Sequence, residues 1–564
     1  MNKGKFIIKY RWWILTVSII ITIAFGLQIP RAKIDPDINH YIPKTMTSRV
    51  NTQRIENIFG GNDMLVVVLK TEDVLSAVTL KRLKKISKSV NQMDGINKTL
   101  SLFDSKSIRG ENGAMIVEPA IKRIPKTSDE RESLRSNLKN NDLVYKTVVS
   151  SDFTMAAVIM ILNQGVSEED IITEVNSIIK ETPGMEDIFL GGLPYLKAIV
   201  SKDLSHDFKT LLPGGLVIML IMLYFFFRQK RGVMLPFSVV IMAIIISMGI
   251  MPLVGWKMSI ITLLLPIVLI AVANDYGIHL IARYQELAHG KTNGYNQKEL
   301  SAKVFVSLKT PIILTGITTL AGILSLLSHQ MIPARQLGIL AATGIGFALI
   351  LSLLFIPGML SFLKNDRLRF SKSSGRNDWF ERVIIRYGKI VTAHPKQILG
   401  ISLIVVILTG VGLTFLKVDT NIENFFPKKH PARIGAAIIN QNFGGTQTIS
   451  LLVEGDIKDP DLLNRMDLYT NALELHEGVG SVMSIADVIK EMSKAINDKG
   501  DQWYNDIPDS RNAVAQYFEL YSMSGDPEDF EQLVDFDYKY AQIIVTLNDG
   551  SNTGLAKKSS KVGR

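Results

Sequence analysis

A carboxylic acid and an imidazole lie one helical turn apart in the run AVANDYGIHLIAR (271–283). Asp275 and His279 are four residues apart, so on a helix they share one face. Residues 260–273 before them carry no charge. A group that can be neutral or charged at modest cost is what a proton carrier needs, and acids in membrane spans are usually functional. The spacing therefore predicts proton transfer at Asp275.

Two structural interpretations of Asp275 stay open. It could be a permanently protonated acid that packs helices through hydrogen bonds, or it could lie near the cytoplasmic interface. We place it about five residues past the middle of its apolar run, or roughly 7 Å from the midplane. Hydroxyl partners for it are available on the two apolar runs that follow, at Thr315, Thr318, Thr319 and Thr343.

His279 has two interpretations of equal weight. Its ordinary pKa near neutrality would let it pass a proton towards the cytoplasm. It could instead orient Asp275 without taking up a proton. Tyr276 lies about 100 degrees from Asp275 around the helix, so we expect it to meet a different helix.

Composition points to a membrane protein. The 564 residues are 47% hydrophobic and 21% charged, with a mean hydropathy of +0.20. The formal net charge is +10, but Lys and Arg cluster beside apolar runs, which favours membrane topology over nucleic-acid binding. The sequence has no Cys, so disulfides and thiolate metal sites are excluded. Its eight His show no zinc spacing, and we expect no metal and no cofactor.

Seven apolar runs are long enough to cross a bilayer, which takes about 20 residues. These runs cover residues 12–29, 209–227, 233–254, 258–282, 310–328, 337–362 and 398–416. The loops at 228–232 and 283–309 and the stretch 363–397 are rich in Lys and Arg. The positive-inside rule places these loops and the N-terminus in the cytoplasm.

The remaining long segments, 30–208 and 417–564, are then outside the cytoplasm. In the first, strand patterns at 64–70, 154–162 and 187–193 alternate with helical patterns at 75–93 and 166–181. Such alternation predicts small α/β domains. The stretch 378–391 is amphipathic and basic, and we expect it to lie along the inner membrane surface.

An internal repeat relates the two outer segments. KIDPDINHYIPK (33–44) aligns without gaps with KVDTNIENFFPK (417–428), an offset of 384. FGG at 59–61 aligns with FGG at 443–445, and DFTMAAVIMILN (152–163) with DYKYAQIIVTLN (537–548). Duplicated halves are common in transporters, whose working site lies between the repeats.

The organisation that follows is 1–29 (N-terminus and span one), 30–208 (first outer domain), 209–362 (spans two to six), 363–397 (cytoplasmic linker), 398–416 (span seven) and 417–564 (second outer domain). The first copy continues through five further spans after its outer domain. Equal copies would end the second one near residue 745, so we expect about 181 residues to be missing, in the same or a separate chain. The fold class is a polytopic α-helical membrane protein with extracytoplasmic α/β domains and a truncated two-fold repeat.

This layout resembles the resistance-nodulation-division transporter superfamily, in its branch of lipid and hydrophobe exporters of the mycobacterial-membrane-protein-large and hopanoid-exporter types. The features that carry the resemblance are the two-copy layout, GGLP at 191–194 and NDYGIHL at 274–280. Asn274-Asp275-Tyr276 is similar to the Asp-Tyr form of the lipid exporters, whereas multidrug members have two adjacent acids.

The resemblance implies export driven by the proton-motive force across a bacterial cytoplasmic membrane, with the outer segments as porter domains. It implies a proton relay at Asp275, Asn274, Tyr276 and His279, and a lipid or other hydrophobic substrate. It also leaves open a homo-oligomer. The residues that bind the substrate are not indicated.

Two other functions compete with export. One is a non-transporting lipid sensor of the sterol-sensing type, and the other is an accessory factor for protein translocation. We expect no enzyme activity. An intramembrane aspartyl protease is disfavoured, because it needs a second acid on a neighbouring span and the spans show none.

Overall fold

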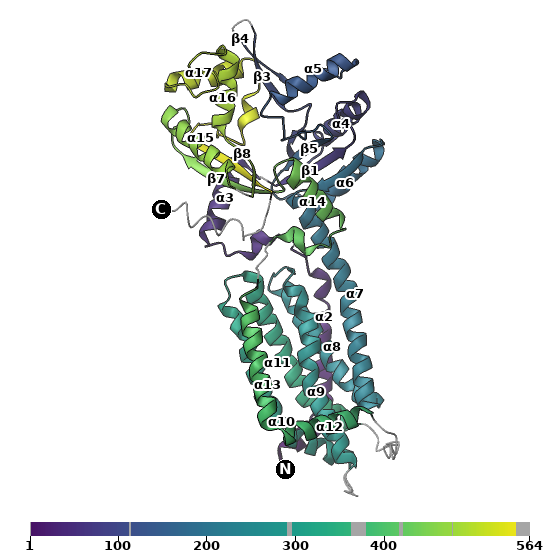
Figure 1. Ribbon diagram of the computed structural model, residues 1–564. Coiled ribbons are helices and arrows are strands. Elements are labelled where there is room, and N and C mark those ends of the chain that lie inside the picture. The colour runs from purple at the N-terminus through teal and green to yellow at the C-terminus, as the bar shows by residue number, and fades with distance from the viewer. Residues whose placement is uncertain are drawn as a thin grey trace. The chain divides into compact units, whose positions relative to one another are not determined.

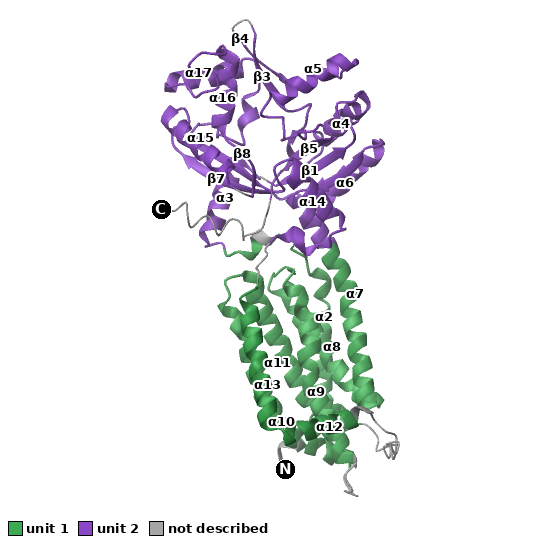
Figure 2. Cartoon of the chain, in the orientation of Figure 1, with its two compact units in different colours: residues 1–43, 203–417 green, residues 44–202, 418–564 purple. Residues whose placement is uncertain are grey.

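The computed structural model describes residues 2–35, 37–61, 63–111, 114–289, 296–362, 379–416, 421–476 and 478–548. The chain divides into two compact units, coloured separately in Figure 2. Residues 1–43 and 203–417 form what we call the helical unit, and residues 44–202 and 418–564 form the sheet unit. The sequence predicts a first outer domain from residue 30 to residue 208, whereas the first segment of the sheet unit runs from 44 to 202. Its start is later than predicted because residues 33–41 bond to the helical unit.

The helical unit is built almost entirely from helices, most of them long and apolar (Figure 1). They are α1 (Asn2–Lys9), α2 (Arg11–Gly26), α7 (Leu193–Phe227), α8 (Lys230–Leu253), α9 (Leu265–His289), α10 (Gln297–Leu324), α11 (Ile332–Leu360), α12 (Trp379–Ala393) and α13 (Pro395–Leu413). Short 3-10 turns lie at η1 (Ile29–Arg31), η2 (Ile38–Tyr41), η3 (Thr262–Leu264) and η4 (Ser325–Ser328). Within the described residues, seven helical segments are long and apolar enough to span a membrane.

The core of this unit lies around α8 and α11, which contribute most of its buried side chains. Helix α11 packs against α2, α8, α9 and α10. By contrast, none of the residues of α13 is buried, and all of them are described. Helix α12 contacts α13, and residues 363–378 before it, the first part of the predicted basic linker, are outside the described residues.

A small latch ties the segment after α2 to the loop before α9. Ile34 and Met258 form a parallel β-bridge, and the Asp35 amide donates to the Met258 carbonyl. The Tyr41 hydroxyl donates to the Asp35 carbonyl and accepts from the Ile260 amide. His40 Nδ1 lies 3.0 Å from the Asp35 carboxylate. These bonds explain why residues 33–41 belong to the helical unit.

The sheet unit contains two antiparallel sheets. The first has strand order β2-β5-β1-β6, formed by β1 (Met64–Lys70), β2 (Ile96–Leu100), β5 (Met155–Leu162) and β6 (Asp187–Gly191). All eight residues of β5 are buried, because it is a central strand. Helices α4 (Ala77–Val90) and α6 (Glu168–Glu181) pack together, and a separate hairpin forms from β3 (Lys106–Glu111) and β4 (Ala114–Pro119).

The second sheet has strand order β7-β9-β8, from β7 (Gln447–Glu454), β8 (Val479–Met483) and β9 (Tyr540–Leu547). Its helices are α15 (Pro460–Glu474), α16 (Ile485–Ile496) and α17 (Arg511–Ser522), with η6 (Pro527–Phe530). The order matches β1-β5-β2 of the first sheet: β9 begins and ends 385 residues after β5, and η5 (Ile422–Phe425) lies 384 residues after η2. Residues 417–420 of the aligned segment are outside the described residues.

The two sheets exchange helices. Helix α3 (Thr47–Phe59), which precedes the first sheet, contacts β7 of the second, and α14 (Pro431–Asn442) contacts β6 of the first. A Cβ on Gly435 would lie 2.1 Å from the Leu190 carbonyl oxygen, so this close approach requires glycine. The β3–β4 hairpin in turn packs against α16. Each sheet therefore completes its core with parts of the other half of the chain.

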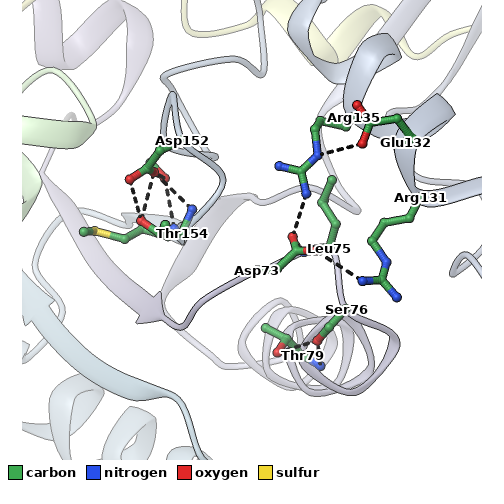
Figure 3. Close-up of polar contacts among 11 residues, drawn as sticks. Asp73, Leu75, Ser76, Thr79, Arg131, Glu132, Arg135, Asp152 and Thr154 are labelled. Carbon is green, nitrogen blue, oxygen red and sulfur yellow. Dashed lines mark hydrogen bonds and ion pairs between the residues drawn. The ribbon is translucent and has the colours of Figure 1, made fainter. Parts of the chain in front are cut away.

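Ion pairs fix the remaining helix of the first half, α5 (Ser128–Lys139), near the loop after β1. Figure 3 shows Arg131 and Arg135 of this helix pointing at the Asp73 carboxylate, at 3.4 and 3.1 Å. Figure 3 also shows Asp152, which accepts hydrogen bonds from Thr154. The sequence patterns predicted neither α5, which is mostly polar, nor the β3–β4 hairpin.

Candidate functional site

The predicted relay lies on α9, in the membrane-length segment Thr262–Ala288. Thirteen residues of this segment precede Asp275 and thirteen follow it, so Asp275 is at its midpoint. The estimate of five residues past the middle refers to the apolar run alone, and the helix continues beyond that run as far as His289. Both structural interpretations of Asp275 therefore stay open.

Asp275 and His279 form a pair on the outer face of α9. The distance from Asp275 Oδ1 to His279 Nε2 is 3.4 Å, as the spacing of one turn predicts. Their side chains are 51% and 61% exposed, respectively. The acid therefore does not pack into the core of the helical unit. Its ion-pair partner among the described residues is His279.

Asn274 and Tyr276 point the other way. Tyr276 is among the largest fully buried side chains of the chain. The Asn274 Oδ1 atom and the Tyr276 hydroxyl are buried without a regular hydrogen bond to any described group. The four predicted relay residues thus separate into an outward acid–imidazole pair and an inward amide–phenol pair.

The threonines considered as partners of Asp275 bond elsewhere. The hydroxyls of Thr315, Thr318, Thr319 and Thr343 all donate to backbone carbonyls of their own helices. Thr319 of α10 approaches the Tyr276 hydroxyl, although the geometry falls short of a regular hydrogen bond. The expectation that Tyr276 meets a different helix is therefore confirmed, whereas none of the four threonines that were available as partners donates to Asp275 in the described contacts.

Gly277 fixes the packing of α9 beside the relay. A Cβ at this position would lie 2.7 Å from the Pro236 Cβ of α8, closer than side chains tolerate. Glycine therefore allows α8 and α9 to cross closely at the level of Asp275. This close contact holds the inward face of α9 against α8 and leaves the opposite face exposed.

The sheet unit contains a second candidate, a mostly apolar cavity of about 100 Å³ between its two sheets. Alternate residues of four strands line it, as expected for side chains on one face of each strand. The strand residues are Met64, Val66, Ile159, Ile161, Ser481, Met483, Ile544 and Thr546, and Ile439 of α14 and Phe443, the residue after that helix, close it. Gln532 also lines it, and its buried Nε2 atom has no hydrogen-bond partner among the described groups.

Sequence reasoning missed this cavity. The strand pattern of β5 and its alignment with β9 were visible, but both segments read as ordinary strands. Only the pairing of the sheets shows that the two patterns face one space. Among the described residues, no group of three or more His, Asp or Glu is placed to hold a metal ion.

A set of membrane-length helices, with one sheet after the first of them and a second sheet after the last, defines a polytopic helical membrane protein. The chain belongs to the MMPL family, whose match covers residues 42–398. That stretch contains the first sheet, spans two to six and the Asp275–His279 pair.

Three relatives show how far the similarity extends. The membrane protein MJ1562 of Methanocaldococcus jannaschii is 25% identical over 363 residues, which cover 61% of this chain and 89% of that protein. The probable transport protein MmpL1 of Mycobacterium tuberculosis is 21% identical over 80% of this chain. The siderophore exporter MmpL5 of the same organism is 23% identical over 73% of it. The chain matches 47% and 43% of the lengths of the two mycobacterial proteins.

Proposed function

We propose that the chain forms part of an exporter of lipids or other hydrophobic molecules, driven by the proton-motive force. Family membership and the two mycobacterial relatives support a membrane exporter. The observation that carries proton coupling is Asp275, an ionisable acid within the membrane-length segment Thr262–Ala288, whose Oδ1 lies 3.4 Å from His279 Nε2. A charged carboxyl at the centre of a bilayer costs about 2.5–3.5 kcal/mol.

The proposed architecture assigns the sheet unit to the outside of the cytoplasmic membrane, as paired porter domains that arose by duplication. The recurring strand order and the 385-residue offset of β5 and β9 support duplication. The cavity between the sheets is the proposed place for part of the substrate. Its apolar strand residues suit a hydrocarbon segment, and the unpartnered Gln532 amide suits a hydrogen-bond acceptor on it.

Asp275→Asn tests proton coupling. Asn retains the size and hydrogen-bonding capacity of a protonated Asp but cannot release a proton. We expect export and proton uptake in vesicles with an imposed pH gradient to stop, while expression and thermal stability hold. His279→Gln should slow export and shift its pH dependence. A protonated Asp that only packs helices would tolerate Asn, since the lost bond is worth at most about 1–2 kcal/mol.

Glu286→Gln is the matched control. Glu286 lies on the same helix, is also exposed and pairs with Arg283 at 2.6 Å. It is eleven residues closer to the end of the span, so its neutralisation should leave export unchanged. Export at the wild-type rate by Asp275→Asn would refute proton coupling. Lipid binding that is indifferent to the gradient would favour a lipid sensor instead.

A further inference from the structure

The strand β2 at one end of the first sheet carries a sequence motif that export does not use. Residues 97–99 read Asn-Lys-Thr, the acceptor motif for N-linked glycans. Asn followed two positions later by Ser or Thr, with no proline between, occurs once in the 564 residues. A motif this short also matches by chance, so the surroundings of its residues in the fold must decide whether it is used.

Asn97 has the placement that an acceptor amide needs. The register between β2 and β5 shifts between Ile96 and Lys98, so Asn97 is the extra residue of a β-bulge. Its side chain is exposed. Lys98 Nζ, by contrast, donates to the carbonyls of Glu528 and Asp529 at 3.1 and 2.8 Å. Lys98 thus anchors the strand to the second half of the sheet unit, while the amide beside it stays open to solvent.

The hydroxyl of Thr99 has no role in the folded sheet. Thr99 is 5% exposed and lies opposite Met160, which is fully buried. In the described part of the sheet unit, its hydroxyl is the one buried hydroxyl without a hydrogen-bond partner. The buried hydroxyls of Thr79, Ser87 and Ser101 each donate to a carboxylate. Burying an unpartnered hydroxyl destabilises a fold, and Val would fill the same space without one. Packing therefore does not explain why this residue is Thr.

We propose that Asn97 is a site of N-linked glycosylation and that the Thr99 hydroxyl serves the transferase that reads the motif. The co-substrate is a saccharide linked to a polyprenyl phosphate or diphosphate. The Asn97 Nδ2 atom forms a bond to the anomeric carbon of the saccharide, whose bond to the phosphate oxygen breaks. The lipid phosphate leaves with the bonding electrons, and the amide loses one proton to a base of the transferase.

The burial of Thr99 sets the order of events. A transferase can contact this hydroxyl only before β2 pairs with β5, so transfer precedes completion of the first sheet. The exposed side chain at the bulge then leaves the saccharide in solvent, where a bulky polar group displaces no side chain of the core. The site rests on the proposed location of the sheet unit outside the cytoplasm, where glycosylated surfaces of membrane proteins lie.

Peptide mass spectrometry of the full chain, purified from the membranes of its own organism, tests the site. We expect the peptide that contains Asn97 to carry the added mass of a saccharide. Asn97→Gln and Thr99→Val should each lose the addition, whereas Thr99→Ser should keep it. Asn91→Gln is the matched control, because Asn91 is also exposed and precedes β2 outside the motif. An unmodified wild-type peptide would overturn the proposal, and so would an addition that persists in Thr99→Val.

A second measurement separates the glycan from the location of the sheet unit. Met185 lies in the loop before β6, and its side chain is fully exposed. In intact cells, labelling of Met185→Cys by a membrane-impermeant maleimide, together with an unmodified Asn97, would overturn the glycan alone and leave the exporter standing. Protection of Met185→Cys would overturn the outside location, and with it both the glycan and the proposed architecture.

The unused hydroxyl can be tested without the saccharide. In the Asn97→Gln background neither chain is modified, so Thr99→Val changes only the interior of the sheet. We expect the thermal unfolding midpoint of the double variant in detergent to equal or exceed that of Asn97→Gln. A lower midpoint would show that the hydroxyl serves the fold, and would remove the reason to assign it to a transferase.

Discussion

At the scale of single residues, Glu186 is a charge of the sheet unit that its neighbours enclose. Its side chain is 4% exposed and pairs with Arg82, which is 9% exposed, while the Thr79 hydroxyl donates to the same carboxylate. Burial alone would raise the pKa of Glu186, but the hydrogen bonds from Thr79 and Arg82 outweigh it, so the pKa lies below its ordinary value. The carboxylate is thus held charged by its partners.

Glu186→Gln should destabilise the sheet unit by about 3–5 kcal/mol, because it leaves the Arg82 guanidinium buried without its counter-charge. Glu132→Gln is the control, since Glu132 is 78% exposed and its pair with Arg135 contributes little. The thermal unfolding midpoint of the full chain in detergent measures both. Equal midpoints for Glu186→Gln and wild type would show that the pair is dispensable.

The same carboxyl predicts a pH dependence. Because its folded pKa is lowered, its stabilising contribution is fully present above the unfolded value of about 4.3 and is lost as the pH falls through the folded value. The midpoints of wild type and Glu186→Gln should therefore differ at neutral pH and converge in acid. A constant difference down to acid pH would assign the effect to packing.

At the scale of elements, α12 illustrates a helix whose surroundings decide its role. Arg382, Arg386 and Lys389 recur at intervals of four and three, so they share one side, and Val383, Tyr387 and Ile390 share another. All six are exposed in the helical unit. This division of charge is typical of helices that lie in a membrane interface rich in anionic lipid.

A fluorophore on Ile390→Cys can report this contact in proteoliposomes that contain brominated lipids. We expect stronger quenching in anionic than in zwitterionic bilayers. The triple substitution Arg382→Gln, Arg386→Gln and Lys389→Gln should abolish that difference, since each cation contributes about 1 kcal/mol near an anionic surface. The same label on Ile404→Cys, within α13, should be quenched alike in both lipids. Lipid-independent quenching at residue 390 would mean that the cations do not contact the membrane.

At the scale of the whole molecule, the apolar runs predicted the seven membrane-length helices of the described residues but not their lengths. Helix α7 begins at Leu193, 16 residues before the apolar run at 209, because its first turns carry charged residues that hydropathy alone assigns to a domain. The outward direction of Asp275 could not be predicted either. Helical periodicity places Asp275 and His279 on one face, but only packing against α8 and α11 decides which face that is.

The orientation of the molecule in the membrane still rests on the distribution of Lys and Arg in the loops, and it can be tested directly. In single-cysteine variants of intact cells, a membrane-impermeant maleimide should label Met185→Cys and Met523→Cys, whose side chains are fully and largely exposed in the sheet unit. It should label Lys298→Cys, at the exposed start of α10, only after permeabilisation. The physical reason is that an odd number of spans separates residue 298 from each of the other two sites, namely spans two to four on one side and five to seven on the other.

Labelling of Lys298→Cys in intact cells together with protection of Met185→Cys would reverse the orientation. Labelling of Met185→Cys with protection of Met523→Cys would instead mean that one of the segments between them does not cross the membrane. The two sheets would then lie on opposite sides of the membrane, although their exchanged helices require one common side.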